Sequence, residues 1–404
     1  MNFRDQFHLP VDASGHPLAY LCGNSLGLQP KRVATLVSEE LEDWQRLAVE
    51  GHFQARRPWM PYHEFVREPL ARLVGAQPDE VVAMNALTVN LHLMMVSFYR
   101  PSGTRTKIVI ERGAFPSDRH AVVSQLRFHG IDPADGLVEL EPREGEATLR
   151  EEDIEAMFAR LGETIALVLL PGVQYYTGQF VDIKRLTAAA HAQGARVGVD
   201  LAHAAGNVPL RLHDWGPDFA VWCHYKYCNA GPGAVGGCFV HARHAESFDL
   251  PRFAGWWGHD QSTRFRMGPE FVPQRGADGW QVSNPPILSL APLLASLEIF
   301  DAAGGVEGLR PHSEKLTGML ERLLERRAGD VVEILTPREP ARRGCQLSLR
   351  IRGGNGKRVH DALGKRGIVC DWREPDVIRA APTPLYNTSE EIERFVAALI
   401  EAVL

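Results

Sequence analysis

The middle of the chain alternates short apolar runs with longer segments in which apolar residues recur at helical spacing. The helical segments are Ser117 to Phe128, Arg150 to Leu161 and Ile183 to Gln193. The apolar runs are rich in Val and Ile, which is typical of strands buried on both faces. They are Lys107 to Glu111, Ala166 to Leu170, Ala195 to Asp200, Phe219 to Trp222 and Gly237 to His241. This alternation predicts an α/β fold with a mostly parallel sheet flanked by helices.

The pattern changes after Pro285-Pro286. Four leucines between 290 and 297 follow the spacing i, i+3, i+4, i+7, which predicts a helix that links two domains. Beyond about Gly305 the order is helix, strand (Gln346 to Ile351), helix (Lys357 to Lys365), two short strands and a final helix. That last helix opens on the capping-box pattern Thr388-Ser389-Glu390-Glu391. We therefore expect an N-terminal segment at 1–48, a large domain at 49–286, and the linking helix with a smaller α+β domain at 287–404.

Composition narrows the functional classes. The 404 residues carry 44 Lys and Arg against 50 Asp and Glu, a net charge of −6, which gives no electrostatic reason to expect nucleic acid or an anionic membrane as partner. No apolar run approaches the roughly 20 residues of a membrane span, and the first residues lack the apolar core of a signal peptide. We expect a cytoplasmic protein. The six cysteines form no Cys-x-x-Cys pair, so reduced, buried thiols are expected, and no metal site is predicted.

Two residues point to a specific chemistry. Lys226 lies in His224-Tyr225-Lys226-Tyr227, directly before a glycine-rich stretch that begins at Gly231. Asp200 ends an apolar strand, and ligands of parallel sheets bind beyond the carboxyl ends of strands. A lysine amine among small and aromatic residues can condense with an aldehyde cofactor, and an aspartate can keep the cofactor's ring nitrogen protonated. Asp200 could instead cap the following turn.

Other residues could complete such a site. The turn that ends at Leu87 and Thr88 places amides and a hydroxyl at a helix start, where phosphate binds, although Thr is also an ordinary cap. Phe115 could stack on a flat ring or pack in the core, and Asp118 could contact a cofactor or begin a helix. Arg379 lies in a short apolar strand, where it needs a partner: a substrate carboxylate or an internal acid.

Several ordered motifs resemble the kynureninase family. They run from about Leu21 to the C-terminus and are Asp200-Leu201-Ala202-His203-Ala204-Ala205-Gly206-Asn207, His213-Asp214-Trp215-Gly216, His224-Tyr225-Lys226-Tyr227, Gly255-Trp256-Trp257-Gly258-His259, Val282-Ser283-Asn284-Pro285-Pro286 and Pro384-Leu385-Tyr386-Asn387. The resemblance implies the aspartate-aminotransferase-like fold, the cofactor pyridoxal 5′-phosphate and a homodimer with shared active sites. Pro171 departs from the family pattern, because relatives often carry a small hydroxyl residue there.

The resemblance also assigns roles to residues. Lys226 would bind the cofactor covalently, and Asp200 would pair with its ring nitrogen. Tyr225 is our own candidate for relaying a proton in the later steps. Phe115 would stack on the ring. The cofactor would be surrounded by Leu87, Thr88, Phe115, Pro116, Ser117, Asp118, Asp200, His203, Tyr225 and Lys226, with Trp256 and Asn284 from the partner subunit. The substrate would be bound by Arg379 at its carboxylate and by His52, Trp257 and Asn284 at its aromatic end.

The implied reaction is hydrolytic Cβ–Cγ cleavage of L-kynurenine or 3-hydroxy-L-kynurenine to anthranilate or 3-hydroxyanthranilate plus L-alanine, in tryptophan catabolism and NAD biosynthesis. Ser283-Asn284 resembles family members that prefer the 3-hydroxy substrate, so we expect good activity on it. The alternative is another enzyme of the same fold, an aminotransferase or a cysteine desulfurase-like protein. A metal hydrolase lacks a His-x-x-x-His or His-x-His cluster, and a non-catalytic binding protein would not need Lys226, Asp200 and Arg379 together.

Overall fold

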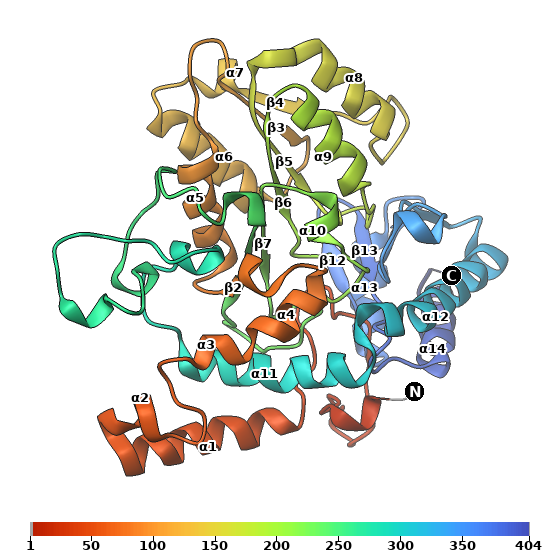
Figure 1. The fold of residues 1–404 in the computed structure, drawn as a ribbon. Coiled ribbons are helices and arrows are strands. Elements are labelled where there is room, and N and C mark those ends of the chain that lie inside the picture. Colours follow the sequence, from red (N-terminus) through yellow and green to blue (C-terminus); the bar gives the residue numbers. More distant parts are fainter. Residues whose placement is uncertain (1–2, 404) are drawn as a thin grey trace.

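The computed structural model describes residues 3–403 and shows a large α/β part beside a smaller α+β part (Figure 1). The large sheet has the strand order β2-β8-β7-β6-β5-β3-β4. Its strands are β2 (Val81–Ala83), β3 (Lys107–Glu111), β4 (Leu137–Leu140), β5 (Ile165–Pro171), β6 (Arg196–Asp200), β7 (Phe219–Cys223) and β8 (Gly236–Val240). The pairs from β4 through β7 are parallel, whereas β8 runs antiparallel to both β7 and β2. The predicted mostly parallel sheet is confirmed.

Helices cover both faces of this sheet. Successive residues of a strand point to opposite faces, and the residues on both faces are apolar, so both faces are buried. In β5, Leu167 and Leu169 belong to one buried cluster, while Val168 and Leu170 belong to another on the opposite face. The helices of this part are α1 (Arg32–Leu47), α2 (Gly51–Gln54), α3 (Tyr62–Phe65), α4 (Arg67–Val74), α5 (Leu87–Phe98), α6 (Pro116–Phe128), α7 (Pro133–Gly136), α8 (Glu151–Leu161), α9 (Ile183–Ala192), α10 (Leu212–Trp215) and α11 (Ile287–Ala302).

The smaller part has its own core and contains an antiparallel sheet of order β12-β13-β10-β9; the short strand β11 lies outside this sheet. Its strands are β9 (Val332–Ile334), β10 (Leu347–Ile351), β11 (Ile368–Val369), β12 (Asp371–Arg373) and β13 (Val377–Ala380), and its helices are α12 (Gly305–Ala328), α13 (Gly356–Lys365) and α14 (Ser389–Val403). The predicted capping box is present, because the Thr388 amide donates to Glu391 and the Glu391 amide donates back to the Thr388 hydroxyl.

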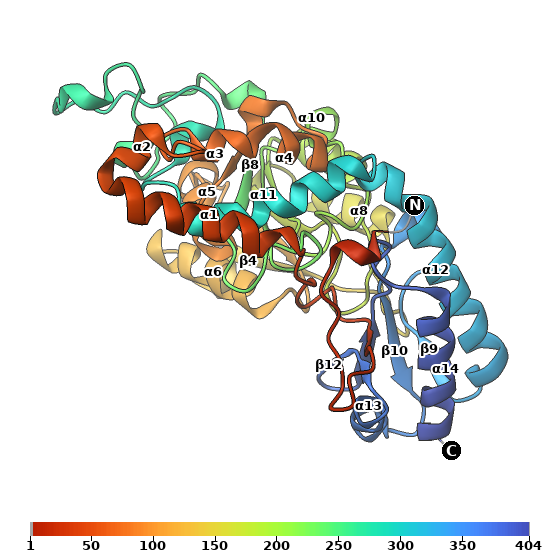
Figure 2. The ribbon, with the colours of Figure 1, turned by 90° about the horizontal axis from the view of Figure 1, so that it is seen from below.

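The first 48 residues contact both parts. Strand β1 (Ala19–Tyr20) pairs with β11, and Ala19 and Leu21 lie in the smaller core, whereas α1 packs along α11 (Figure 2). The helix α12 also extends from one core to the other, since Leu309 belongs to the large core and Leu316 to the small one. The division at residues 48 and 286 stays a prediction.

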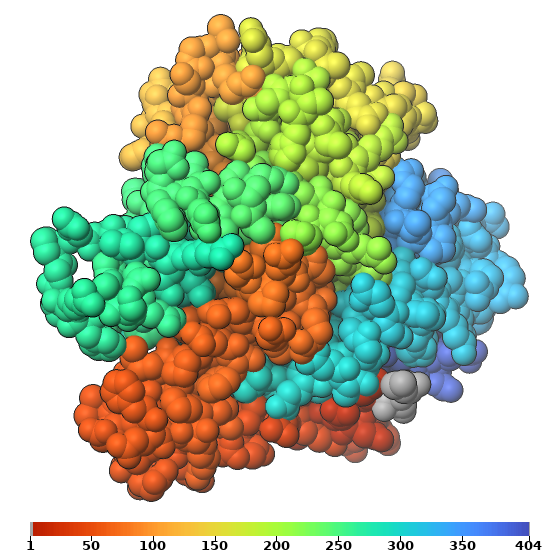
Figure 3. Space-filling model, in the orientation of Figure 1, coloured from red at the N-terminus to blue at the C-terminus, as the bar shows by residue number. Residues whose placement is uncertain are grey.

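One segment projects from the large part. The chain between β8 and α11 forms an extended loop beside α2 and α3, which Figures 1 and 2 both show at the same end of the molecule. The space-filling view shows this loop standing out from the body (Figure 3). In residues 3–403, no single helix is long and apolar enough to cross a membrane; α11 and α12 pass that test only as a bent pair.

Candidate active site

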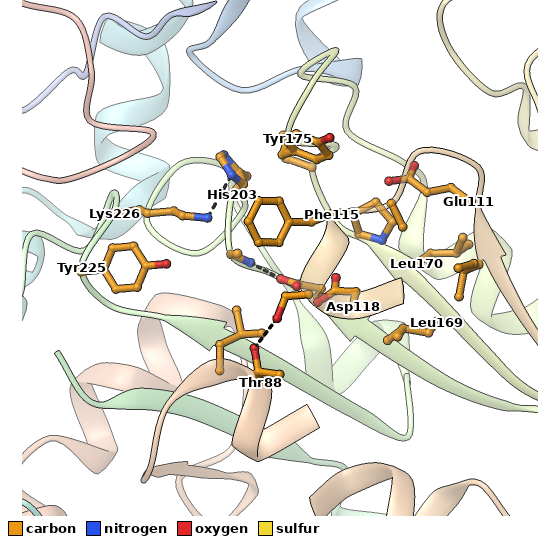
Figure 4. A pocket seen from close by; sticks show the side chains of 18 residues that line it. Thr88, Glu111, Phe115, Asp118, Leu169, Leu170, Tyr175, His203, Tyr225 and Lys226 are labelled. Carbon is orange, nitrogen blue, oxygen red and sulfur yellow. Dashed lines mark hydrogen bonds between the residues drawn. The ribbon is translucent and has the colours of Figure 1, made fainter. Parts of the chain in front are cut away.

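A pocket with about 680 Å³ of empty space opens at the carboxyl edge of the large sheet (Figure 4). The ends of β3, β5 and β6 form its floor, the loop after β7 forms one wall, and the N-termini of α5 and α6 form another. The sequence-predicted residues that line it are Leu87, Thr88, Phe115, Ser117, Asp118, Asp200, His203, Tyr225 and Lys226. Pro171 also lines it, at the end of β5.

Lys226 is held by a tightly constrained loop. The buried His224 donates from Nδ1 to the carbonyl of Val235 (2.6 Å) and accepts at Nε2 from the indole of Trp222 (2.7 Å). This arrangement needs a neutral imidazole, and burial lowers the pKa of His224 to about 4. On the other side, Gly27 donates its amide to the Tyr225 carbonyl at 2.8 Å, and a Cβ at Gly27 would collide with the carbonyl oxygen of Lys226. The lysine backbone therefore has little freedom.

The amine of Lys226 faces His203 across the pocket. Nζ lies 3.0 Å from Nε2 of His203 and 5.8 Å from the ring centroids of both Phe115 and Tyr225. Burial, and then the positive charges of Lys226 and Arg379, hold the pKa of His203 well below its usual range. A neutral His203 accepts the lysine N–H at Nε2, which leaves Nδ1 as a buried donor without a partner among residues 3–403.

Three acids gather in the pocket: Glu111 and Asp200 end strands, and Asp118 lies in the first turn of α6. Asp200 accepts a hydrogen bond from the Ala202 amide at 2.6 Å, so it shapes the turn that follows β6. Burial and the nearby Asp200 raise the pKa of Asp118 well above normal, and Asp118 Oδ1 has no partner in the described chain. Burial also raises the pKa of Glu111 to about 8. A cation placed against Asp200 and Asp118 would relieve their mutual repulsion.

Two helix starts converge beside Asp118. The hydroxyls of Thr88 in α5 and Ser117 in α6 are 2.8 Å apart. Pro116 occupies the first helical position of α6, where a missing N–H is tolerated, and does not itself line the pocket. Amides and hydroxyls at two helix N-termini make a site for an anion such as phosphate.

Phe115 lines the pocket and is 41% exposed, so its ring does not belong to the hydrophobic core. It meets the ring of Tyr175 edge to face at 5.3 Å, and both rings line the pocket. One face of Phe115 is thus available to a flat ligand, as the sequence predicted for one of its two alternatives.

Arg379 is fully buried and already has an internal partner. Its Nε donates to Oδ2 of Asp371 at 2.6 Å, and its Nη1 donates to the carbonyl of Tyr175 at 2.7 Å. The internal ion pair that the sequence left open is therefore present. Arg379 does not line the pocket directly but lies behind Tyr175, which does.

The structure does not bring the remaining predicted residues to this pocket. His52, in α2, contacts the Val49 carbonyl and the ring of Trp59. Trp257 is buried against the guanidinium of Arg264, with 4.4 Å from ring centroid to Cζ. Trp256 and Asn284 are exposed and lie in the chain between β8 and α11, which forms the projecting loop.

Glu111 and Tyr175 line the pocket but were not among the sequence predictions, and Gln174 contacts Glu111 from outside the lining. The side-chain amide of Gln174 donates from Nε2 to Glu111 at 3.2 Å. Its Oε1 accepts hydrogen bonds from the backbone amides of Tyr176 and Thr177. Glu111 ends β3 as Asp200 ends β6, so the same strand-end argument would have found it.

Comparison with known proteins gives a consistent result. Residues 309–399 match the family model described as the kynureninase C-terminal domain. The kynureninase of Koribacter versatilis (strain Ellin345) is 58% identical over 98% of this chain and 93% of that protein. The kynureninase of Myxococcus xanthus (strain DK1622) is 60% identical, again over 98% and 93%.

Two solved structures share the fold at low identity. The complex of the cystine C-S lyase C-DES with its product cysteine persulfide is 20% identical, with a TM-score of 0.80 over 95% of this chain and 97% of that one. The apo cysteine desulfurase of Thermococcus onnurineus is 19% identical, with a TM-score of 0.78 over 96% and 94%.

Proposed function

The chain belongs to the kynureninase family, and we propose that the pocket around Lys226 is where the family's cofactor and substrate meet. The family consists of pyridoxal-phosphate-dependent hydrolases that act on carbon–carbon bonds. The reaction is the hydrolytic cleavage of the Cβ–Cγ bond of L-kynurenine or its 3-hydroxy form, which yields an anthranilate and L-alanine.

The pocket contains groups that suit each polar part of pyridoxal phosphate. The orphan oxygen of Asp118 and the carboxylate of Asp200 suit a protonated ring nitrogen. The paired hydroxyls of Thr88 and Ser117 at two helix starts suit the phosphate. Lys226 supplies the amine for the aldehyde, and Phe115 and His203 flank the ring. When bound, the cofactor supplies an electron sink for a carbanion at the substrate Cα.

Side chains of this protein transfer the protons and orient the substrate. The Nζ of Lys226 is the base at the substrate Cα, because His203 accepts a hydrogen bond from this amine and so directs its lone pair. Arg379 binds the α-carboxylate. The phenol of Tyr225, whose pKa burial raises, keeps its proton at neutral pH and can deliver it in the later steps.

We also propose that a second copy of the chain completes the aromatic end of the site. His52 lies in α2, and Trp256 and Asn284 lie in the chain between β8 and α11, which projects beside α2 (Figure 2). Large apolar side chains of α2 and α1 are exposed, among them Phe53 (64% exposed) and Trp44 (59% exposed). An apolar surface of this kind marks an interface. In a homodimer, these residues would reach the partner's pocket, and Asn284 would contact the aryl carbonyl or the 3-hydroxyl.

The observation that carries the proposal is the single lysine amine in an acid-lined pocket, 3.0 Å from a neutral histidine. Borohydride reduction of the yellow protein, followed by peptide mass spectrometry, should place the cofactor adduct on Lys226, and added kynurenine should yield fluorescent anthranilate and alanine in equal amounts. An adduct at another residue would refute the assignment. The ratio of kcat/KM for 3-hydroxykynurenine and kynurenine tests the proposed preference; a large preference for kynurenine contradicts it.

No observation favours the alternatives. A cysteine desulfurase needs an accessible thiolate, whereas Cys345 is fully buried and burial raises its pKa to about 12. Among the described residues, the group that could hold a metal is Glu80, His213 and His241, which does not line this pocket. Glu80 already accepts hydrogen bonds from the amides of Gln77 and Ala242.

A further inference from the structure

The partner of Arg379 is set by the register of a hairpin. Strands β12 and β13 are antiparallel, and Asp371 is the direct cross-strand neighbour of Arg379. Arg373 lies two residues further along β12, on the same face, because side chains in a strand alternate. Its Nε donates to the same carboxylate oxygen, Oδ2 of Asp371, at 2.9 Å. Two arginines therefore share one aspartate, which leaves one uncompensated positive charge.

The guanidinium of Arg379 is held from two sides but is not saturated. A guanidinium has five N–H donors. Nε donates to Asp371 and one donor of Nη1 goes to the Tyr175 carbonyl. Nη2 lies within ion-pair distance of Asp371 Oδ2, yet it makes no hydrogen bond of good geometry to any described residue, although the side chain is 1% exposed. Donors on Nη1 and Nη2 thus remain, which is what a carboxylate needs for a bidentate contact.

Tyr175 connects this arginine to the pocket. Its ring contacts Phe115 in the pocket wall, while its carbonyl accepts from Arg379 and from Nε2 of Gln346 at 3.1 Å. The charges of Arg379 and Arg373 are also close enough to lower the pKa of His203, the partner of Lys226. The guanidinium of Arg379 therefore lies directly behind the part of the pocket wall that Tyr175 forms.

We propose that Asp371 is a positioning residue for substrate recognition: it holds the Nε side of Arg379 so that the remaining Nη donors meet the substrate α-carboxylate end-on. This inference rests on the proposed function, in which Arg379 binds that carboxylate. Asp371 does not touch the substrate. It fixes the rotation of the guanidinium, and Arg373 balances its charge so that Arg379 keeps a net attraction for an anion.

The test replaces Asp371 by an isosteric neutral residue in the holoenzyme. Asp371→Asn should raise the KM for kynurenine roughly tenfold, the size expected for a loosened charge-assisted contact, and change kcat by less than about threefold. The concentration of L-alanine that half-saturates the change in cofactor absorbance should rise by a similar factor. Glu333→Gln is the matched control, because Glu333 pairs with Arg350 in the same sheet; it should change neither value.

A double-mutant cycle separates positioning from a general structural role. In an Arg379→Lys background, Asp371→Asn should raise KM by less than about twofold, because the donors that Asp371 orients are gone. An equally large effect in that background, or an unchanged or lowered KM from Asp371→Asn alone, overturns the inference. If Asp371→Asn does not fold, Asp371→Glu, which keeps the charge but shifts it by one methylene, should raise KM instead; an unchanged KM with this variant also overturns it.

The same experiments distinguish the two levels of the argument. If Arg379→Lys alone leaves the KM for kynurenine and the L-alanine response unchanged, Arg379 is not the carboxylate site, and the proposed role of Arg379 fails together with the inference. If Arg379→Lys raises KM but Asp371→Asn does not, only the positioning role of Asp371 is wrong.

Discussion

The predicted site residues fall into two groups that differ in burial and contacts: one group lines the pocket, and the other lies on the projecting surface. Around Lys226, buried groups already contact one another: the amine meets His203, Thr88 meets Ser117, and Asp118 lies against Asp200. On the projecting segments, Asn284 is exposed and does not line the pocket. Under the proposed function, one chain therefore supplies the cofactor site, and the aromatic end of the substrate site is left to a partner chain.

This difference follows from where the residues lie in the fold. The pocket residues stand at strand ends and helix starts inside the large core, so the packing of one domain fixes them. The projecting segment has little core of its own; Phe265 and Met267 are 61% and 76% exposed. Apolar side chains in this state need a partner surface. The comparison predicts that pocket variants act within one chain and surface variants act between chains.

The largest effect is expected from Lys226→Ala. Without the amine, the chain has no covalent anchor for the cofactor and no base at the substrate Cα, so kcat should fall by at least about 10³-fold. Anthranilate fluorescence measures the activity, and the reduced protein should carry no adduct. Lys184→Ala, at an exposed site on α9, is the control and should behave as wild type. Substantial activity in Lys226→Ala would remove the pocket from the catalytic argument.

The next largest effect should distinguish the two aspartates of the pocket. Asp200→Asn keeps an oxygen for the Ala202 amide but loses the charge, so kcat should fall by about 100-fold. Asp118→Asn should cost less than about tenfold, because burial and the neighbouring Asp200 raise the pKa of Asp118, which makes its negative charge the less favoured of the two. Steady-state kinetics on both variants, with cofactor content measured by absorbance, checks the order. A larger loss for Asp118→Asn would reverse the assigned roles.

A smaller effect is expected from Asn284→Ala, which tests whether the projecting surface acts on a partner chain. Asn284→Ala should lower kcat/KM about tenfold, the loss of one polar contact. If Asn284 acts on the partner's pocket, mixing equal amounts of Asn284→Ala and Lys226→Ala chains should restore activity, since half of the dimers are mixed and each of these has one intact site. About a quarter of all sites would then be wild type.

The mixing experiment has a clear alternative outcome. If Asn284 acts within its own chain, no mixed dimer contains an intact site, and activity stays at the low level of the Asn284→Ala chains alone. Co-purification of an untagged Lys226→Ala chain with an affinity-tagged Asn284→Ala chain serves as the control for subunit exchange.

Much of the fold follows from local pattern, and the exceptions have physical reasons. Strand Lys107–Glu111 is found at its predicted bounds, because the three consecutive β-branched residues from Ile108 to Ile110, with a charged residue at each end, leave few alternatives. The antiparallel direction of β8 was not predicted. It follows from the connection after β7, which carries the Lys226 loop instead of a helix, so the chain turns back along the same edge.

The site shows the same limit. Lys226 and Asp200 could be identified because each lies within a short motif whose residue types suit one chemistry. The pairing of Arg379 with Asp371 could not, since it depends on the register of a hairpin, and a shift of one residue would separate them. The proposed placement of Asn284 at the partner's pocket depends on a second chain, about which the pattern of a single sequence carries no geometric information.

The smallest effect concerns the floor of the pocket and should be independent of any partner chain. Burial raises the pKa of Glu111 to about 8, above the 4.5 of an ordinary glutamate, and Gln174 is its hydrogen-bond partner. Between about pH 4.5 and 8 the folded protein therefore keeps a proton that the unfolded chain releases. Stability must fall as pH rises through this window, because folding opposes the ionisation of Glu111.

Glu111→Gln removes this ionisation while keeping the shape of the side chain and an oxygen for Gln174. The variant and the wild type should unfold at similar temperatures near pH 5, and the variant should become more stable by about 1–2 kcal/mol as pH approaches 8. Thermal unfolding followed by circular dichroism from pH 5 to 8.5 measures the difference. Glu141→Gln, an exposed acid just after β4, should show no such trend. A difference between variant and wild type that does not grow with pH would mean that Glu111 is ionised in the folded protein, and that the pocket floor is more solvated than its enclosure implies.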